Sequence, residues 1–106
     1  MNEELIRTLG DELYQALMSR SPLEPLTNRH ADITIEDAYH VQQRMISRRR
    51  EAGERIVGKK IGVTSRAVMN MLGVFQPDSG YLLDGIIVCE GDSIDSRTLI
   101  QPKAEG

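Results

Sequence analysis

The hydrophobic pattern of this 106-residue chain changes its period near residue 55. Before that point apolar residues recur at helical spacing, most clearly in the series Leu5, Leu9, Leu13 and Leu17. After it, short apolar runs are broken by Asp-Gly and Gly-Asp pairs, a pattern typical of strands joined by turns. Helices followed by strands predict an α+β fold. We expect a helical region over residues 1–55 and a strand-bearing region over residues 56–106.

Capping signals predict where the helices begin and end. The segment TIED, residues 34–37, predicts a capping box in which the side chains of Thr34 and Asp37 each accept a hydrogen bond from the other residue's backbone N–H. A long helix should follow and end near Gly53. In the second half, SRAVMNMLG predicts a short helix with Ser65 as its N-cap.

Composition and charge exclude several classes of partner. A net charge of -3 argues against nucleic acid, because phosphate binding relies on an excess of clustered Lys and Arg. Cys89 is the only cysteine, which excludes an intrachain disulfide and fits a reducing compartment, and we expect it to be a small buried residue. The amino terminus has no secretory-signal pattern, and no apolar run is long enough to span a bilayer. We therefore predict a cytoplasmic protein without a membrane partner.

The segment IVGKKIGVTS, residues 56–65, places two lysines in an apolar, glycine-rich strand pattern. Alternation along a strand points Lys59 and Lys60 to opposite faces. Lys60 has Gly58 and Gly62 two residues to either side on its own face, so the space beside it is empty of side chains and can receive a ligand. A lysine that simply faces solvent on an exposed sheet is the alternative, and Lys59 is expected to be such a surface residue.

The last residues, LIQPKAEG, have the pattern of the start of another strand. They carry no terminal cap and no polar tail. We expect a chain that is cut inside a fold.

Five segments, taken together and in order, resemble one enzyme family: LGDELYQAL, EDAYHVQQRM, AGERIVGKKIGVTS, MLGVFQPDSGYL and IQPKAEG. They are similar to the amino-terminal part of the 2-keto-4-pentenoate (2-hydroxypenta-2,4-dienoate) hydratases, which belong to the fumarylacetoacetate hydrolase superfamily. The resemblance implies that residues 56–106 begin a β-rich catalytic domain that is incomplete here. It also implies a homo-oligomer.

The resemblance implies a reaction of aromatic meta-cleavage catabolism. Water adds to 2-hydroxypenta-2,4-dienoate to give 4-hydroxy-2-oxopentanoate, while Mg²⁺ or Mn²⁺ holds the substrate carboxylate and its 2-oxygen. The chemistry needs a hard cation with oxygen ligands, together with acid–base groups that move protons to carbon and from water.

The resemblance assigns catalytic roles to Lys60 and Asp78. Lys60 matches the family's strand lysine, and Asp78 in QPDSG matches an aspartate that pairs with this lysine or positions water. Without the resemblance, an aspartate in a turn that begins with proline requires no function.

Three further residues receive binding roles from the same resemblance. Thr64 and Ser65 would hydrogen-bond the substrate carboxylate at the strand end, although a plain N-cap is an equally good interpretation of Ser65. Glu105 aligns with the first acid of a Glu-x-Glu metal motif. The remaining ligands lie beyond the end of this chain, so we expect the isolated piece to be inactive.

Two alternatives stay open at this stage. The related 2-oxo-3-hexenedioate decarboxylase uses similar metal chemistry and associates with the hydratase in some pathways, so it is both a competing identity and a candidate partner. A non-catalytic helical interaction module, offering the Leu5 to Leu17 stripe to another protein, is the alternative from a different class. A coding sequence that continues past Gly106 with Glu at the next position would favour the enzyme, and a stop codon there in an intact gene would favour the module.

Overall fold

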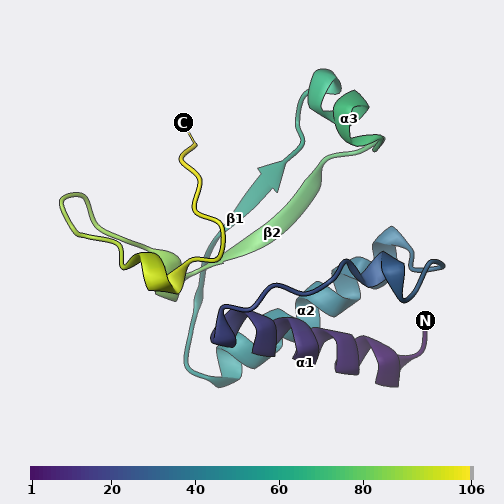
Figure 1. Ribbon diagram of the computed structural model, residues 1–106, viewed down its shortest axis with the longest axis horizontal. Coiled ribbons are helices and arrows are strands. Elements are labelled where there is room, and N and C mark those ends of the chain that lie inside the picture. Colours follow the sequence, from purple (N-terminus) through teal and green to yellow (C-terminus); the bar gives the residue numbers. More distant parts are fainter. Residues whose placement is uncertain (106) are drawn as a thin grey trace. The chain divides into compact units, whose positions relative to one another are not determined.

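The computed structural model describes residues 1–105 and divides the chain into two compact units (Figure 1). Of the described residues, 1–52 and 88–105 form the first unit, and Gly53–Ile87 form the second. Helices and a two-stranded antiparallel sheet are both present, so the expected α+β composition is confirmed. No helix in the described part of the chain is both long enough and apolar enough to cross a membrane.

The first unit is built on two capped helices. Helix α1, Glu3–Ser19, begins where the Asn2 side chain accepts a hydrogen bond from the backbone N–H of Leu5 at 2.8 Å. Helix α2, Ile35–Glu51, begins at the predicted capping box, in which Thr34 and Asp37 exchange two 3.0 Å hydrogen bonds. These side chains satisfy backbone N–H groups that have no partner within the helices, which stabilises the helix ends.

The helices α1 and α2 pack through a small apolar core and a close backbone approach. Leu9, Val41 and Ile46 are buried between them. A Cβ atom added to Gly10 would overlap the Cβ and Cγ atoms of Arg44, so the missing side chain is what allows α2 to lie so near. Glycine at position 10 lowers the helix propensity of α1, but its lack of a side chain allows close packing of the two helices.

Charged groups border this helix pair. Asp11 accepts from Arg44 Nε at 2.8 Å and lies 2.9 Å from Arg48 Nη1. The hydrogen bond from Arg44 lowers the pKa of Asp11 below its usual range, with Arg48 adding to the effect. Arg48 also lies over the ring of Tyr14, with its Cζ 4.6 Å from the centroid, so this arginine is held by two partners at the helix end.

The second unit is a hairpin with a helix in its connection. Strand β1, Ile56–Gly62, pairs antiparallel with strand β2, Asp78–Leu83, and helix α3, Arg66–Leu72, lies between them in sequence. The ladder is irregular between Ile56 and Gly58, where Val57 is the extra residue of a β-bulge. From Gly58 onward the pairing is regular, so strand alternation holds around the lysines.

Several expectations for the second half of the chain were wrong. Asp78 is the first residue of β2 and not part of a turn. Past Leu83 the described residues contain two short 3-10 helices, Asp84–Ile86 and Ser96–Thr98, instead of further strands. Cys89 is exposed instead of buried. Asp78 extends the strand because the ladder pairs it with Gly62. Past Leu83 and at Cys89 the reason is a missing partner, because a strand needs a hydrogen-bonding neighbour and a buried residue needs a covering layer.

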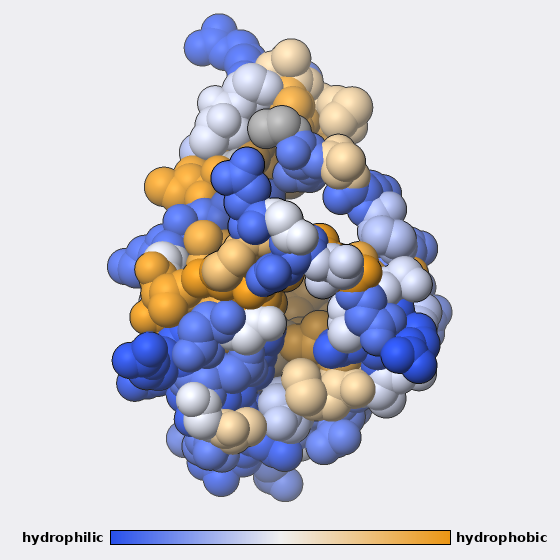
Figure 2. All heavy atoms as spheres, turned by 90° about the vertical axis from the view of Figure 1, so that its left-hand side faces the viewer, coloured by the Kyte–Doolittle hydropathy of each residue, from blue (hydrophilic) through white to orange (hydrophobic). Residues whose placement is uncertain are grey.

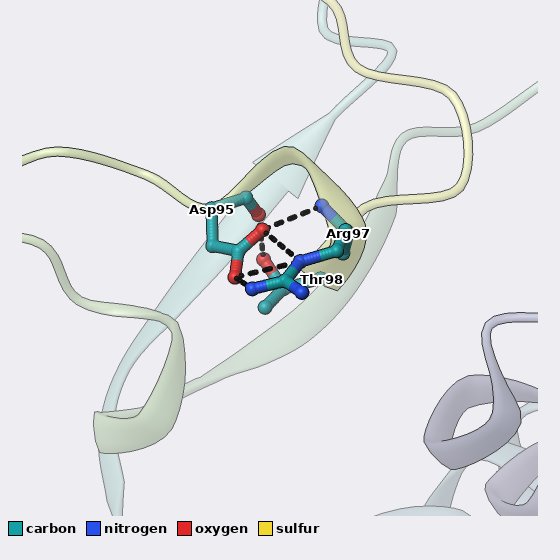
Figure 3. A network of polar contacts seen from close by, with 3 residues as sticks. All are labelled: Asp95, Arg97 and Thr98. Carbon is teal, nitrogen blue, oxygen red and sulfur yellow. Dashed lines mark hydrogen bonds and ion pairs between the residues drawn. The ribbon is translucent and has the colours of Figure 1, made fainter.

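The segment that follows β2 carries apolar residues at its surface and is ordered by local contacts. In this segment Ile87 and Ile94 are each about 60% exposed. Figure 2 shows hydrophobic side chains exposed among polar ones on one face of the molecule. Around the second 3-10 helix, Asp95 accepts hydrogen bonds from the backbone and guanidinium of Arg97, while the Thr98 hydroxyl donates to the Asp95 carbonyl at 2.6 Å (Figure 3). The hydrogen bonds from Arg97 lower the pKa of Asp95.

Candidate functional site

The two neighbouring lysines of β1 face opposite sides of the hairpin, as alternation predicts. Lys59 is paired across the ladder with Tyr81, and its Nζ lies 5.7 Å from the centroid of that ring. Lys60 is paired with Gly80 and lies on the other face. Lys59 thus lies beside an aromatic neighbour, whereas Lys60 lies on the face that carries Gly58, Gly62 and Gly80.

Glycine surrounds Lys60 on three sides. Gly58 and Gly62 lie two residues away along β1, and Gly80 lies directly across on β2. The hairpin has a concavity of about 400 Å³ whose lining includes Lys60, Gly62 and Gly80. Sequence alternation predicted the first two glycines, but Gly80 was missed, because only the register of the strands places it opposite the lysine.

Asp78 lies on the same face of the hairpin as Lys60. It is paired with Gly62, two positions along the ladder from the Lys60–Gly80 pair. Diagonal positions of this kind are about 7–8 Å apart along the backbone, a separation that a lysine side chain can reach across. Both Lys60 and Asp78 line the concavity, so the structure brings the two residues with predicted catalytic roles to one hollow.

The backbone changes direction immediately after Gly62. Val63 has a φ of 55°, a left-handed conformation that is unfavourable for a β-branched residue. Sequence reasoning missed this residue, because no pattern of residue types signals a strained valine. Val63 lines the concavity and forms the junction between β1 and the residues that lead into α3.

The next two residues have different surroundings from those of Lys60 and Asp78. Ser65 is the N-cap of α3, and its hydroxyl oxygen accepts a hydrogen bond from the backbone N–H of Val68 at 3.1 Å. Thr64 is exposed. The lining of the concavity reaches Val63 but includes neither Thr64 nor Ser65. The capping role of Ser65 is observed, and substrate binding by the two hydroxyls stays a prediction.

Glu105 belongs to the first unit, in an irregular exposed segment. Within residues 1–105, no three His, Cys, Asp or Glu side chains are grouped in a way that could hold a metal ion. A single carboxylate does not satisfy the six or more oxygen ligands of a hard cation. The described residues therefore do not form a metal centre by themselves.

A larger concavity, about 570 Å³, lies on the helical unit and is a weaker candidate. Its charged lining includes Asp11 and Arg48, which pair with each other. It also includes Glu12, whose carboxylate is 2.6 Å from Arg29 Nη2, and that hydrogen bond lowers the pKa of Glu12. The lining of this larger concavity includes none of the residues with predicted catalytic or binding roles, so the smaller hollow, which holds Lys60 and Asp78, is the better candidate.

Comparison with known proteins identifies the class and then the family. No protein-family model matches the chain. Its fold matches that of 4-oxalocrotonate decarboxylase from Pseudomonas putida G7, complexed with calcium and acetate, with a TM-score of 0.91 and 33% identity over 94% of this chain and 39% of that one. The same decarboxylase complexed with magnesium and adipate gives a TM-score of 0.77 over 80% of this chain and 32% of that one.

Comparison of sequences narrows the assignment from this fold to one enzyme family. The chain is 58% identical to 2-hydroxypent-2,4-dienoate hydratase of Pseudomonas putida over 100% of its own length and 48% of that protein. By sequence, it belongs to the family of these hydratases, which are also named 2-keto-4-pentenoate hydratases. It spans about half the length of that hydratase.

Proposed function

We propose that the full-length protein adds water to 2-hydroxypenta-2,4-dienoate to give 4-hydroxy-2-oxopentanoate. The observation that carries this proposal is the glycine-lined hollow that holds Lys60 and Asp78, in a chain 58% identical to a hydratase of this substrate. A flat, planar dienoate suits a hollow that glycines help to line, because the substrate can approach the backbone beside the lysine.

The reaction divides into two steps, a ketonisation and a hydration, and each includes proton transfers. The dienol first takes a proton at C5 and loses one from its 2-hydroxyl, which gives an unsaturated 2-oxo acid. Water then adds at the electrophilic C4, with a proton delivered to C3. Lys60 is suited to deliver protons to carbon, and Asp78 is suited to orient the attacking water and take up its proton.

A divalent cation is the cofactor that we propose, with Glu105 as one ligand. Support comes from the related decarboxylase, whose solved complexes contain calcium or magnesium. When bound, such a cation would hold the substrate's carboxylate and 2-oxygen and stabilise negative charge on the latter. Residues 1–105 supply no complete ligand set, so the other ligands would come from chain outside this sequence.

The competing proposal is decarboxylation of 2-oxo-3-hexenedioate, and the fold match to a decarboxylase is the observation that favours it. Identity favours hydration, at 58% against 33%. The proposal also retains a cytoplasmic location, a homo-oligomer, and association with the pathway decarboxylase as predictions.

The test is a pair of assays on the full-length protein with Mg²⁺ or Mn²⁺. Loss of the dienoate's ultraviolet absorbance together with formation of 4-hydroxy-2-oxopentanoate is expected. Release of CO₂ from 2-oxo-3-hexenedioate at a comparable rate would instead favour the decarboxylase. Absence of both activities in a folded, metal-supplied protein would favour a non-catalytic interaction module.

A further inference from the structure

The two glycines that flank Lys60 along β1 differ in what lies above them. A Cβ atom added to Gly58 would come no closer than 3.4 Å to Cδ1 of Leu82, which is ordinary contact with the end of a flexible side chain. A Cβ atom added to Gly62 would come within 2.6 Å of Oδ1 of Asp78, a separation that Cβ atoms do not adopt. The carboxylate of Asp78 therefore occupies the volume that a side chain at position 62 would fill.

Backbone conformation does not explain this glycine. Neither Gly58 nor Gly62 has a positive φ, so both positions can accept an L-residue without backbone strain. The requirement at position 62 is one of space alone. It arises from the ladder, which pairs Gly62 with Asp78 and so points both positions to one face.

We infer that Gly62 is a positioning residue for Asp78, and this inference rests on the proposed function. Asp78 is exposed at the start of β2, where a carboxylate would otherwise sample several rotamers. Seated over Gly62, it lies along the face from which Lys60 rises. The absence of a side chain at position 62 thus leaves room for the water-orienting carboxylate on the same face as the proton-carrying lysine.

The substitution Gly62→Ala tests whether position 62 must be free of a side chain for Asp78 to keep its position, because it adds one methyl group and nothing else. The Asp78 carboxylate must rotate away from the strand, and a displacement of about 1 Å can cost roughly 10²-fold in rate. We expect kcat to fall by about that factor with little change in KM, since the substrate's binding groups are untouched. Ile61→Val is the control, because Ile61 is the neighbour of Gly62 on the opposite, exposed face of β1 and does not line the concavity; a change of one methylene there should change kcat little.

A double-mutant cycle separates positioning from simple damage to the strand. In the full-length protein with its metal, kcat is measured for Gly62→Ala and Asp78→Ala, singly and together. If Gly62 acts through Asp78, adding Gly62→Ala to Asp78→Ala causes no further loss, because the displaced group is already gone. Multiplicative losses in the double variant would overturn the inference while leaving the hydratase proposal in place.

A crystal structure of Gly62→Ala gives a readout that does not depend on activity. We expect the Asp78 carboxylate in a different rotamer, with β1 and β2 in unchanged register. An unmoved carboxylate would overturn the inference. Absence of hydratase activity in the parent protein would instead overturn the proposed function. The rotamer in the crystal would still show whether Gly62 sets the position of the Asp78 carboxylate.

Discussion

Replacing each of the two adjacent lysines by methionine should separate catalysis from stability. Lys60 and Lys59 are neighbours in sequence, have the same chemistry and are both exposed, but they lie on opposite faces of β1. Only Lys60 lines the concavity that also holds Asp78. Methionine keeps much of the side-chain volume and removes the ammonium group, so any difference between the two variants reports on which face carries the chemistry.

The expected magnitudes follow from the surroundings of each residue. Loss of a general acid–base group costs roughly 10²–10⁴-fold in turnover, which corresponds to about 2.7–5.4 kcal/mol of transition-state stabilisation. Lys60→Met should therefore lower kcat by that factor and change the free energy of unfolding by no more than about 0.5 kcal/mol, as for other exposed positions. Lys59→Met should leave kcat unchanged and lose about 0.5 kcal/mol of stability, because its 5.7 Å contact with Tyr81 is near the limit for a cation–π interaction.

Both quantities are measured on the full-length protein. Steady-state kinetics that follow the dienoate's absorbance give kcat and KM, and urea unfolding followed by circular dichroism gives stability. Equal kinetic effects of the two substitutions, or a larger effect at Lys59, would refute the assignment of the active face.

Three further predictions concern the metal ligand and the helical unit. Glu105→Gln in the full-length protein should weaken Mg²⁺ binding measured by calorimetry at least about tenfold, since a neutral amide is a poorer ligand for a hard cation, and unchanged affinity would remove Glu105 from the metal site. Gly10→Ala should destabilise the protein by roughly 0–2 kcal/mol in urea unfolding, because overpacking against Arg44 costs about 1–3 kcal/mol and the gain in helix propensity is about 1 kcal/mol. A clear gain in stability would show that the helices do not approach as described. Asp11 has a lowered pKa in the folded state, so its contribution to the free energy of unfolding is present above about pH 4 and is lost as the pH falls below that value. Asp11→Asn should therefore make stability depend less steeply on pH in the acid range, and an unchanged dependence would contradict the pairing with Arg44.

Local features of the chain could be predicted from the sequence because their causes lie within a few residues. The capping box at Thr34 and Asp37 depends on two side chains three residues apart, and it forms as expected. The N-cap at Ser65 has the same local origin. The opposite facing of Lys59 and Lys60 follows from strand alternation, which is a property of the extended backbone itself.

Features that depend on distant residues were decided by the tertiary structure. Glycine at position 10 is unfavourable for a helix by propensity, and only the approach of Arg44 from α2 gives it a packing role. The apolar runs after Leu83 have strand-like composition, but within residues 84–105 they form no strand, because composition does not supply a hydrogen-bonding neighbour.

The candidate site shows the same division. The residue types at Lys60 and Asp78 were visible in the sequence, together with the two glycines of β1. Only the register of β1 against β2 placed Gly80 opposite Lys60 and set Asp78 over Gly62. The physical reason is that a register between residues 16 or more positions apart is set by the pairing of whole strands, whereas each residue's own preferences extend only to its neighbours along the chain.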